Sequence, residues 1–435
     1  MLDFDVGFEK IIMTSKNHTS KTVLAKLIEP LDGLINQCKS KRTCKVLPDH
    51  QWIETCLLRT LSQESSGRAF VQKIYDSGRM FLSRSLFFET LKSKRRLKLC
   101  REINSMVYKK MLIKKWEHDP FAKFSELDEF DIFAGDGHYH AAAAHDKKKN
   151  DKKYPTQHFY AVNLRNQALN HLTLADTSGN RKREHDTRAL KRLDTDTLRQ
   201  SAPKGRKVLY IWDKAGIDFM QWFKWKYSSG IYFISREKEN MDLMMMGHLP
   251  IDRKDPINAG VLSYDIVGCS AGVTIHRVKY QCPVSGKEYS FVTSLPYVAP
   301  GLIAYLYKCR WDIEKVFDQV KNKLSEKKAW ATSQTAKTMQ AQFICLSHNL
   351  MLIYEKHLER NGIINIKENN RRQSRLDKAL KNTSFSIKML PLFLTTPRRA
   401  SQRPLKFIRW LRNHLYTNTS CKEAEGSLRR IYAVF

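Results

Sequence analysis

The chain has 435 residues, enough for two to four domains of ordinary size, and 42% of them are hydrophobic, as in globular proteins. Its 76 Lys and Arg against 44 Asp and Glu give a formal net charge of +32. This excess favours an acidic partner. Nucleic acid fits better than a membrane, because the sequence has no clear basic amphipathic helix or lipid anchor.

The cysteines and the absence of targeting signals indicate the cellular compartment of the protein. The nine cysteines are scattered singly without a Cys-x-x-Cys pair, which disfavours a disulfide framework and a structural zinc site. The N-terminus lacks a signal-peptide pattern, and the apolar run from Ala341 to Tyr354 is interrupted by polar residues. We therefore expect no membrane span and a reduced, cytoplasmic location, close to the nucleoid.

Residues 1–125 are expected to be mostly helical and to contact DNA. The stretch from Ser66 to Lys98 has the outline of a helix-turn-helix, with a break at Asp76-Ser77-Gly78 and a second helix capped by Ser83 or Ser85 that runs into a basic segment. The candidate DNA contacts in that segment are Lys94, Arg95 and Arg96. The alternative is an ordinary helical pair with a solvated basic end.

Residues 126–240 change to the short apolar runs that are typical of strands. The expected strands are Phe130 to Ala134, His158 to Leu164, Leu169 to Ala175, Lys207 to Trp212 and Ile231 to Ile234. Helices are expected from Arg181 to Leu198 and from Ile217 to Trp225. Asp136 and Asp213 stand at the ends of the first and fourth strands. This order predicts an α/β fold, a ribonuclease H-like mixed sheet.

Three further regions follow. Residues 241–298 form a predicted β-rich insertion, with strands at Val261 to Val267, Val273 to Tyr280 and Glu288 to Val292. Residues 299–345 contain one long helix, Pro300 to Leu324, and residues 346–435 are expected to be helical and basic, with loops at Asn369 to Arg375 and Thr396 to Pro404. Four methionines between Met241 and Met246 are expected to pack in the core.

The long helix carries the strongest signal in the chain. At 100° per residue, Tyr307, Arg310, Glu314 and Lys321 fall within about 60° of arc beside an apolar stripe. One helix face would thus present an acid, two cations and a phenol at the edge of the buried surface. An ordinary solvated helix spreads such residues more widely around its exposed side.

This spacing, Tyr-x2-Arg-x3-Glu-x6-Lys, resembles the signature of bacterial insertion-sequence DDE transposases of the family-four type, and the resemblance covers about residues 127 to 345. It implies that Asp136, Asp213 and Glu314 are the catalytic, metal-binding acids, with a β-rich insertion between the last two. It also implies that Tyr307, Arg310 and Lys321 grip phosphates of the transposon end. Arg236, directly after a predicted strand, is a further candidate for the DNA backbone.

The chemistry of DNA cleavage explains these residue types. In-line attack on a phosphodiester needs an activated oxygen and charge neutralisation on the leaving oxygen, and two divalent ions supply both. Carboxylates are natural ligands for two Mg²⁺ (or Mn²⁺) ions. The resemblance implies double-stranded DNA as partner, both terminal inverted repeats and target, and a homodimer in the DNA complex.

Each site residue also has an ordinary structural explanation. Asp136-Gly137 would suit a hairpin turn, Asp213 a helix N-cap, and Glu314 an i,i+4 ion pair with Arg310. Tyr307 would suit the core. A further group, His138, His140 and His145, matches no strong zinc motif.

The sequence departs from the family pattern at one point, and two alternative functions remain open. Some members of the family stack an insertion tryptophan on a base extruded in a hairpin intermediate, but no Trp lies between 226 and 310 here, so Tyr264, Tyr280, Tyr289 or Phe291 would have to substitute. The first alternative is a non-catalytic DNA-binding regulator derived from a transposase. The second is a nuclease of the same fold without strand transfer.

Overall fold

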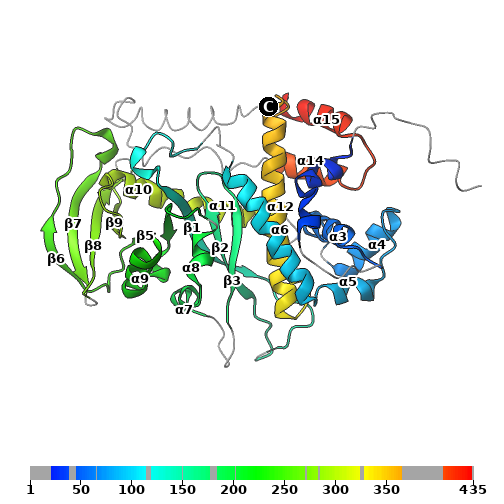
Figure 1. The fold of residues 1–435 in the computed structure, drawn as a ribbon, viewed down its shortest axis with the longest axis horizontal. Coiled ribbons are helices and arrows are strands. Elements are labelled where there is room, and N and C mark those ends of the chain that lie inside the picture. Colours follow the sequence, from blue (N-terminus) through cyan, green and yellow to red (C-terminus); the bar gives the residue numbers. More distant parts are fainter. Residues whose placement is uncertain are drawn as a thin grey trace, which may run out of the picture.

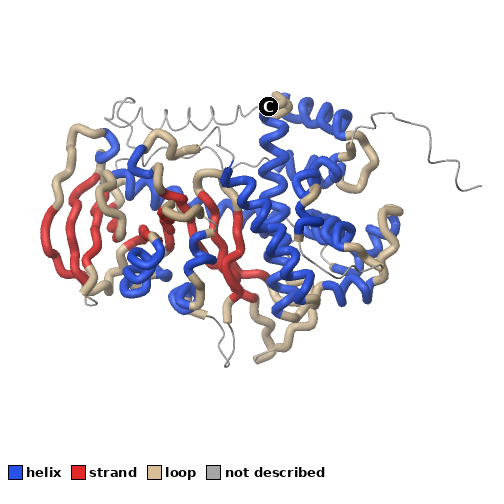
Figure 2. The backbone as a smooth tube through the Cα atoms, in the orientation of Figure 1, coloured by secondary structure: helices blue, strands red, loops and turns tan. Residues whose placement is uncertain are grey.

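The computed structural model describes residues 21–38, 46–64, 66–113, 119–148, 150–176, 184–200, 202–269, 272–282, 285–323, 328–364 and 405–433. A large mixed sheet occupies the centre and one side of the molecule, and helices from both ends of the chain pack together on the other side (Figure 1). Figure 2 shows all strands in the centre and on one side, with further helices beside them, and a purely helical part on the other side. The predicted α/β class with flanking helical regions is confirmed.

The N-terminal region is helical, as expected. Its helices are α1 (Val23–Ile28), α2 (Leu34–Gln37), α3 (Asp49–Leu61), α4 (Gly67–Asp76), α5 (Arg84–Thr90) and α6 (Lys94–Ile113). Ser83 caps α5, because its side chain accepts from the backbone N–H of Leu86. The expectation that this helix runs into the basic segment is wrong. Ser93 accepts from the N–H of Arg96 and starts a new helix, so the basic residues begin α6.

Nine strands form one sheet with the order β3-β2-β1-β4-β5-β9-β8-β7-β6. Their bounds are β1 (Phe130–His140), β2 (Thr156–Asn163), β3 (Leu169–Leu174), β4 (Lys207–Trp212), β5 (Ile231–Arg236), β6 (Leu243–His248), β7 (Val261–Cys269), β8 (Thr274–Gln281) and β9 (Glu288–Thr293). The first five agree with the predicted strands, except that β1 continues past Ala134 to His140. It does so because β2 pairs with it from Phe133 onwards.

The predicted β-rich insertion joins this sheet. Strand β9 pairs antiparallel with β5, and β8, β7 and β6 continue outward from it. The core packing expected for the four methionines is wrong for Met244, Met245 and Met246 of β6, which are 70%, 43% and 60% exposed, whereas Met241 packs, partly buried, against the core. Strand β6 is the last strand of the sheet, so its side chains have no neighbouring strand to cover them on that edge.

The remaining helices are α7 (Asp186–Lys191), α8 (Thr195–Arg199), α9 (Phe219–Ser229), α10 (Pro300–Cys309), α11 (Trp311–Lys323), α12 (Gln334–Arg360), α14 (Leu405–His414) and α15 (Cys421–Ala433). Helix α12 contacts β3, α3 and α6, and it runs unbroken across the expected domain boundary at 345/346. The two loops expected at Asn369 to Arg375 and Thr396 to Pro404 lie outside the described residues.

The C-terminal helices α14 and α15 pack against the N-terminal helices. Helix α1 contacts α14 and α15, and an isolated bridge joins Thr22 to Ser420. The backbone N–H of Cys421 donates to the carbonyl of Lys21. In Figure 1 the blue helix α1 and the orange and red helices α14 and α15 accordingly lie side by side. None of the eight cysteines within the described ranges forms a disulfide, and no helix there is long and apolar enough to cross a membrane.

Asn349 connects α12 to the sheet. Its side-chain amide accepts from the backbone N–H of Leu169 at 2.9 Å and donates to the carbonyl of the same residue at 3.0 Å, and it is completely buried. Leu169 starts β3, the edge strand of the sheet. One side chain therefore satisfies two backbone groups that the sheet leaves open.

We predict that Asn349→Leu lowers the free energy of unfolding by about 2–4 kcal/mol, because two buried backbone groups lose their partners. Chemical denaturation measures this change. Ser347→Ala on the same helix is the matched control, since the buried Ser347 hydroxyl has no hydrogen-bond partner among the described residues and its removal should cost little. Equal losses in the two variants would contradict the role of Asn349.

Candidate active site

The register of β1 and β4 brings the two predicted aspartates together. The strands are parallel and their last pair is Gly135 with Trp212, so Asp136 and Asp213 are the next residue on each strand. Residues at matched positions of parallel neighbours lie side by side on one face of the sheet. Asp136 is therefore inside β1, where it pairs with Tyr160 of β2, and the hairpin-turn alternative for Asp136-Gly137 is wrong.

Trp212, the residue before Asp213, packs against two glycines, Gly135 and Gly216. A Cβ on Gly135 would lie 1.7 Å from the Trp212 ring, and one on Gly216 would lie 1.8 Å from it. The ring is fully buried. Asp213 follows directly and accepts from the N–H of Lys214, so it also caps a short 3₁₀ turn, Lys214–Gly216. The position of the Asp213 backbone thus depends on the indole before it.

We predict that Gly135→Ala displaces Trp212 and lowers stability by about 1–3 kcal/mol, as overpacking does in well-packed cores. The thermal midpoint and the environment of the indole, read from near-ultraviolet circular dichroism, both report it. Gly247→Ala is the matched control on β6, where an added Cβ meets nothing within 4 Å. A Gly135→Ala protein that is as stable as this control would show that the close approach is unimportant.

Two consecutive helices supply the rest of the site. The expected single helix from Pro300 to Leu324 is divided into α10 and α11 by Arg310, a turn residue whose φ of −54° and ψ of −33° stay in the helical region. Tyr307 and Arg310 stand at the end of α10, and Glu314 lies in the first turns of α11. Lys321 is on α11, but its side chain lies outside the described part.

Arg310 contacts two of the three predicted acids. Its Nη1 lies 3.0 Å from Oδ2 of Asp136 and 3.7 Å from Oε1 of Glu314, and the Arg310 side chain is 7% exposed. The ion pair with Glu314 was one of the structural alternatives, and it is present. The guanidinium therefore compensates two carboxylates from different elements, one on β1 and one on α11.

Tyr307 binds Asp213, the third predicted acid, and lies next to Arg310. Its hydroxyl donates to Oδ1 of Asp213 at 3.4 Å, and its ring packs against Phe291 at 5.0 Å between centroids. Burial raises the pKa of Tyr307 to about 12, although Arg310 opposes the shift. The phenol stays protonated at neutral pH and remains a donor to Asp213. Tyr307 is thus both packed in the core and bonded within the site.

Burial has a strong effect on Asp136. It raises the pKa of this carboxyl to about 7, with the Arg310 charge opposing the shift and the neighbouring Glu314 adding to it. Two carboxylates close together in a poorly hydrated place repel each other unless a cation lies between them. In this structure Arg310 is that cation. Among the described residues, no three His, Cys, Asp or Glu side chains form a group that would hold a metal ion in this arrangement.

A fourth carboxylate was missed. Asp186 begins α7, where Gln157 Nε2 donates to its Oδ1 at 3.2 Å. Burial raises the pKa of Asp186, and the Asp213 charge adds to the shift, which places the two acids near each other. The segment around Asp186 is highly charged, and its pattern predicted only a helix, without a site residue. Only the packing of α7 against the turn after β4 brings it to the site.

Other nearby aspartates have structural partners. The ion pairs are Asp131 with Arg206, Asp146 with Lys337 and Asp218 with Lys191. Asp218 also caps α9, since its side chain accepts from the N–H of Gln221. These three acids are therefore used in joining elements of the fold.

Histidines line the sheet face next to Asp136. His138 stacks on Phe317 of α11 at 4.5 Å, and His140 contacts the Tyr160 hydroxyl at 2.7 Å. His158 and His171 lie 3.0 Å apart through their ring nitrogens. Burial lowers the pKa of His140 and His158 well below the usual range and that of His171 to about 3, so these rings are neutral. His145 is exposed outside this cluster.

The predicted DNA contacts have different surroundings. Arg236 ends β5, lies over the Tyr289 ring at 5.5 Å and is close enough to influence Tyr307. Arg95 donates two 2.7 Å hydrogen bonds to Asp49. Arg96 is buried, donates to the Leu47 carbonyl and lies over Trp52. Arg95 and Arg96 thus bind within the protein, while Lys94 is exposed.

The aromatic residues that would substitute for an insertion tryptophan are mostly enclosed. Tyr264, Tyr280 and Phe291 are buried, and Tyr289 is partly covered. Tyr289 alone among the four has an appreciable exposed part, and Arg236 already lies on its ring. The interior position of the other three leaves them no free face for a base.

Residues 123–350, just over half of the chain, match the family model described as "Transposase DDE domain". The protein therefore belongs to the DDE-domain transposases. The mixed sheet with its flanking helices is the ribonuclease H-like fold of such enzymes. Membership implies a metal-dependent enzyme that acts on DNA. The search of curated proteins found no match.

Proposed function

We propose that this protein is an insertion-sequence transposase of the family-four type, which cuts DNA at the ends of its element and joins them to target DNA. The observation that carries the proposal is the convergence of Asp136, Asp213 and Glu314 on Arg310 and Tyr307. In the proposed enzyme, the helical region 1–125 binds the terminal inverted repeats, and residues 346–435 support it. Two protomers bridge two ends.

The donor set fits the divalent ions that the family requires. Asp136, Asp213 and Glu314 offer only carboxylate oxygens, which Mg²⁺ and Mn²⁺ prefer. Burial raises the pKa of Asp136 to about 7 despite the Arg310 charge, so a bound cation would further stabilise the ionised carboxylate. Two such ions, when bound, would lower the pKa of the attacking water and neutralise charge on the leaving oxygen.

The chain's own residues have distinct tasks in this mechanism. The three acids hold the ions, and Tyr307 orients Asp213 by its hydrogen bond. Arg310 and Lys321 hold phosphates of the transposon end, the first as a planar fork and the second as a point charge. Water first opens the phosphodiester and leaves a 3′-hydroxyl. That hydroxyl then attacks a target phosphodiester and displaces another 3′-oxygen, so the number of phosphodiester bonds is conserved in this second step.

We predict that Asp136→Asn and Glu314→Gln each lower the nicking rate on the order of a thousandfold, about 4 kcal/mol of barrier. The assay uses a supercoiled plasmid that carries the DNA flanking this gene, with Mg²⁺ or Mn²⁺. Asp242→Asn, at an exposed position, is the control and should retain full activity. Nicking that survives Asp136→Asn would refute the assignment.

The DNA products of this plasmid assay distinguish a transposase from the two alternatives, a nuclease and a regulator. A transposase yields joined donor–target DNA, which a nuclease of the same fold does not. A regulator would bind the plasmid but leave it uncut.

The ion pairs of Arg310 with Asp136 and Glu314 compete with the binding of a divalent ion by the same carboxylates. This competition can be tested without DNA cleavage. A guanidinium that pairs with Asp136 and Glu314 opposes the entry of a divalent ion between them. We predict that Arg310→Gln raises the affinity of the DNA-free protein for Mn²⁺ roughly tenfold, about 1.4 kcal/mol. Isothermal titration calorimetry or Mn²⁺ paramagnetic resonance measures the change.

Arg236→Gln is the matched control for this measurement. Arg236 is also an arginine near Tyr307, but within the described ranges no carboxylate lies at ion-pair distance from it. Its replacement should leave the Mn²⁺ affinity nearly unchanged. A weaker Mn²⁺ affinity in Arg310→Gln would show that Arg310 supports the ion site instead of competing with it.

A further inference from the structure

Helix α6 exposes a basic stripe of which the sequence analysis identified only the first residue, Lys94, as a DNA contact. On this helix Lys94, Lys98, Arg101 and Lys109 are exposed. At 100° per residue they fall within about 80° of arc, and they span about 22 Å along the axis. The opposite face carries Leu99, Cys100, Ile103, Val107 and Met111, all buried. The four cations therefore form one continuous exposed row, called here the α6 stripe.

The charges of the α6 stripe are largely uncompensated. Lys98 lies 4.0 Å from Glu102, the one acidic residue of this helix, and both side chains are well exposed. No carboxylate in the part of the chain that the structure describes lies at ion-pair distance from Lys94, Arg101 or Lys109. Exposed pairs at this distance contribute little. In contrast, Arg95 and Arg96 on the inner side of the same helix are neutralised or buried.

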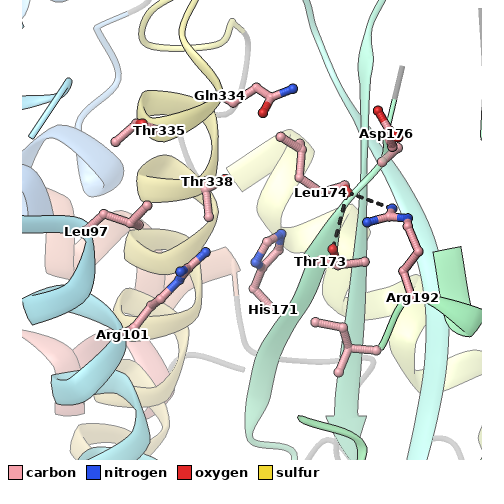
Figure 3. Close-up of a pocket in the computed structure, with 12 residues that line it drawn as sticks. Leu97, Arg101, His171, Thr173, Leu174, Asp176, Arg192, Gln334, Thr335 and Thr338 are labelled. Atoms are coloured by element: carbon pink, nitrogen blue, oxygen red, sulfur yellow. Dashed lines mark hydrogen bonds between the residues drawn. The ribbon is translucent and has the colours of Figure 1, made fainter. Parts of the chain in front are cut away.

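A cavity of about 380 Å³ opens beside the middle of the stripe. Arg101 of α6, His171 and Thr173 of β3, and Thr335 and Thr338 of α12 are in its wall. Figure 3 shows Arg101 and His171 pointing toward each other across this space, with Thr338 close by. The lining thus offers one free guanidinium and several hydroxyls, which together suit a phosphate group.

The other arginine of the cavity has a different role. Arg192 donates to the Glu184 carboxylate and to the Leu174 carbonyl, so its charge is compensated within the protein. Figure 3 shows Arg192 against the far side of β3. This leaves Arg101 as the cation that faces the cavity without a carboxylate partner among the described residues.

We propose that the α6 stripe, with Arg101 at the cavity, is a docking surface for the phosphate backbone of double-stranded DNA. Lysine and arginine contacts of this kind fix the position of a duplex without reading its sequence. With 3.4 Å of axis per nucleotide on each strand, the stripe would follow about six base pairs. The stripe contains no aromatic residue on which single-stranded bases would stack, which favours duplex over single strands.

This inference rests on DNA being the substrate, as proposed above, but it adds a surface remote in sequence from the acids. Since α6 packs along α12, and α12 packs on β3, the stripe is held rigidly relative to the sheet that carries Asp136. A duplex bound there would be fixed in register with the candidate active site. In Figure 1, α6 and α12 lie side by side next to β3.

The test measures binding of a mixed-sequence duplex of roughly two turns, about 20 base pairs, by fluorescence anisotropy in EDTA. The stripe variant replaces Lys94, Lys98, Arg101 and Lys109 by Gln. Each lost phosphate contact reduces the slope of log K against log salt by about 0.9, so the slope should fall by three to four in magnitude, about 3.6 in full. Arg101→Lys should retain the wild-type slope, because the charge is kept.

The control removes the same charges elsewhere. Lys204, Lys224, Lys422 and Arg429 are exposed on other elements, and their joint replacement by Gln should change the slope by less than about one. Thermal melts verify that both variants fold.

The outcomes distinguish the two proposals. An unchanged slope in the stripe variant, or an equal fall in the control, overturns this inference and leaves the proposed function intact. If the wild-type protein does not bind the duplex at all, both are overturned.

Discussion

The parallel pairing of β1 with β4 is the constraint on which the rest of the candidate site depends. It sets Asp136 and Asp213 next to each other, one residue beyond the last strand pair. A shift of either strand by one residue would turn its aspartate to the opposite face of the sheet. The buried Trp212, enclosed between Gly135 and Gly216, holds this register, because no larger residue fits at either glycine.

The second constraint is electrostatic. Asp136 is buried with Glu314 nearby, and such a pair is costly without a cation. Arg310, the turn residue between α10 and α11, supplies the cation, because its guanidinium lies within ion-pair distance of both acids. The ion pairs of Arg310 thus compensate both acids without a metal ion, and in the proposed enzyme they are the contacts that ions and DNA would replace. A buried residue with two alternative partners is a natural point of coupling between metal and DNA.

The nine-stranded sheet gives these groups a rigid support. The insertion strands extend the sheet through β9 and β5, so they stiffen the strand that ends at Arg236. On the other side, α12 joins β3 to the N-terminal helices through contacts such as those of Asn349. The helices proposed to contact DNA and the sheet that carries the candidate active site are consequently parts of one packed framework. Small displacements of the N-terminal helices are transmitted to the sheet, because close-packed interiors have low compressibility.

Local pattern was sufficient for much of this protein. Alternating and continuous apolar runs predicted β1 to β5 and three insertion strands, and the spacing of Tyr307, Arg310 and Glu314 predicted that these side chains share one face. Both depend on periods within a few residues, which the sequence contains in full. The family model supports the class of enzyme predicted from these residues.

Only the tertiary structure decided the rest. The inward turn of Arg95 and Arg96, against the outward turn of Lys98 and Arg101, depends on which face of α6 packs on α12. The approach of Asp186 to Asp213 depends on the packing of α7. The exposure of the β6 methionines follows from their place at the sheet edge. Each of these is a relation between segments distant in sequence, and no local period encodes which distant surface a residue will meet.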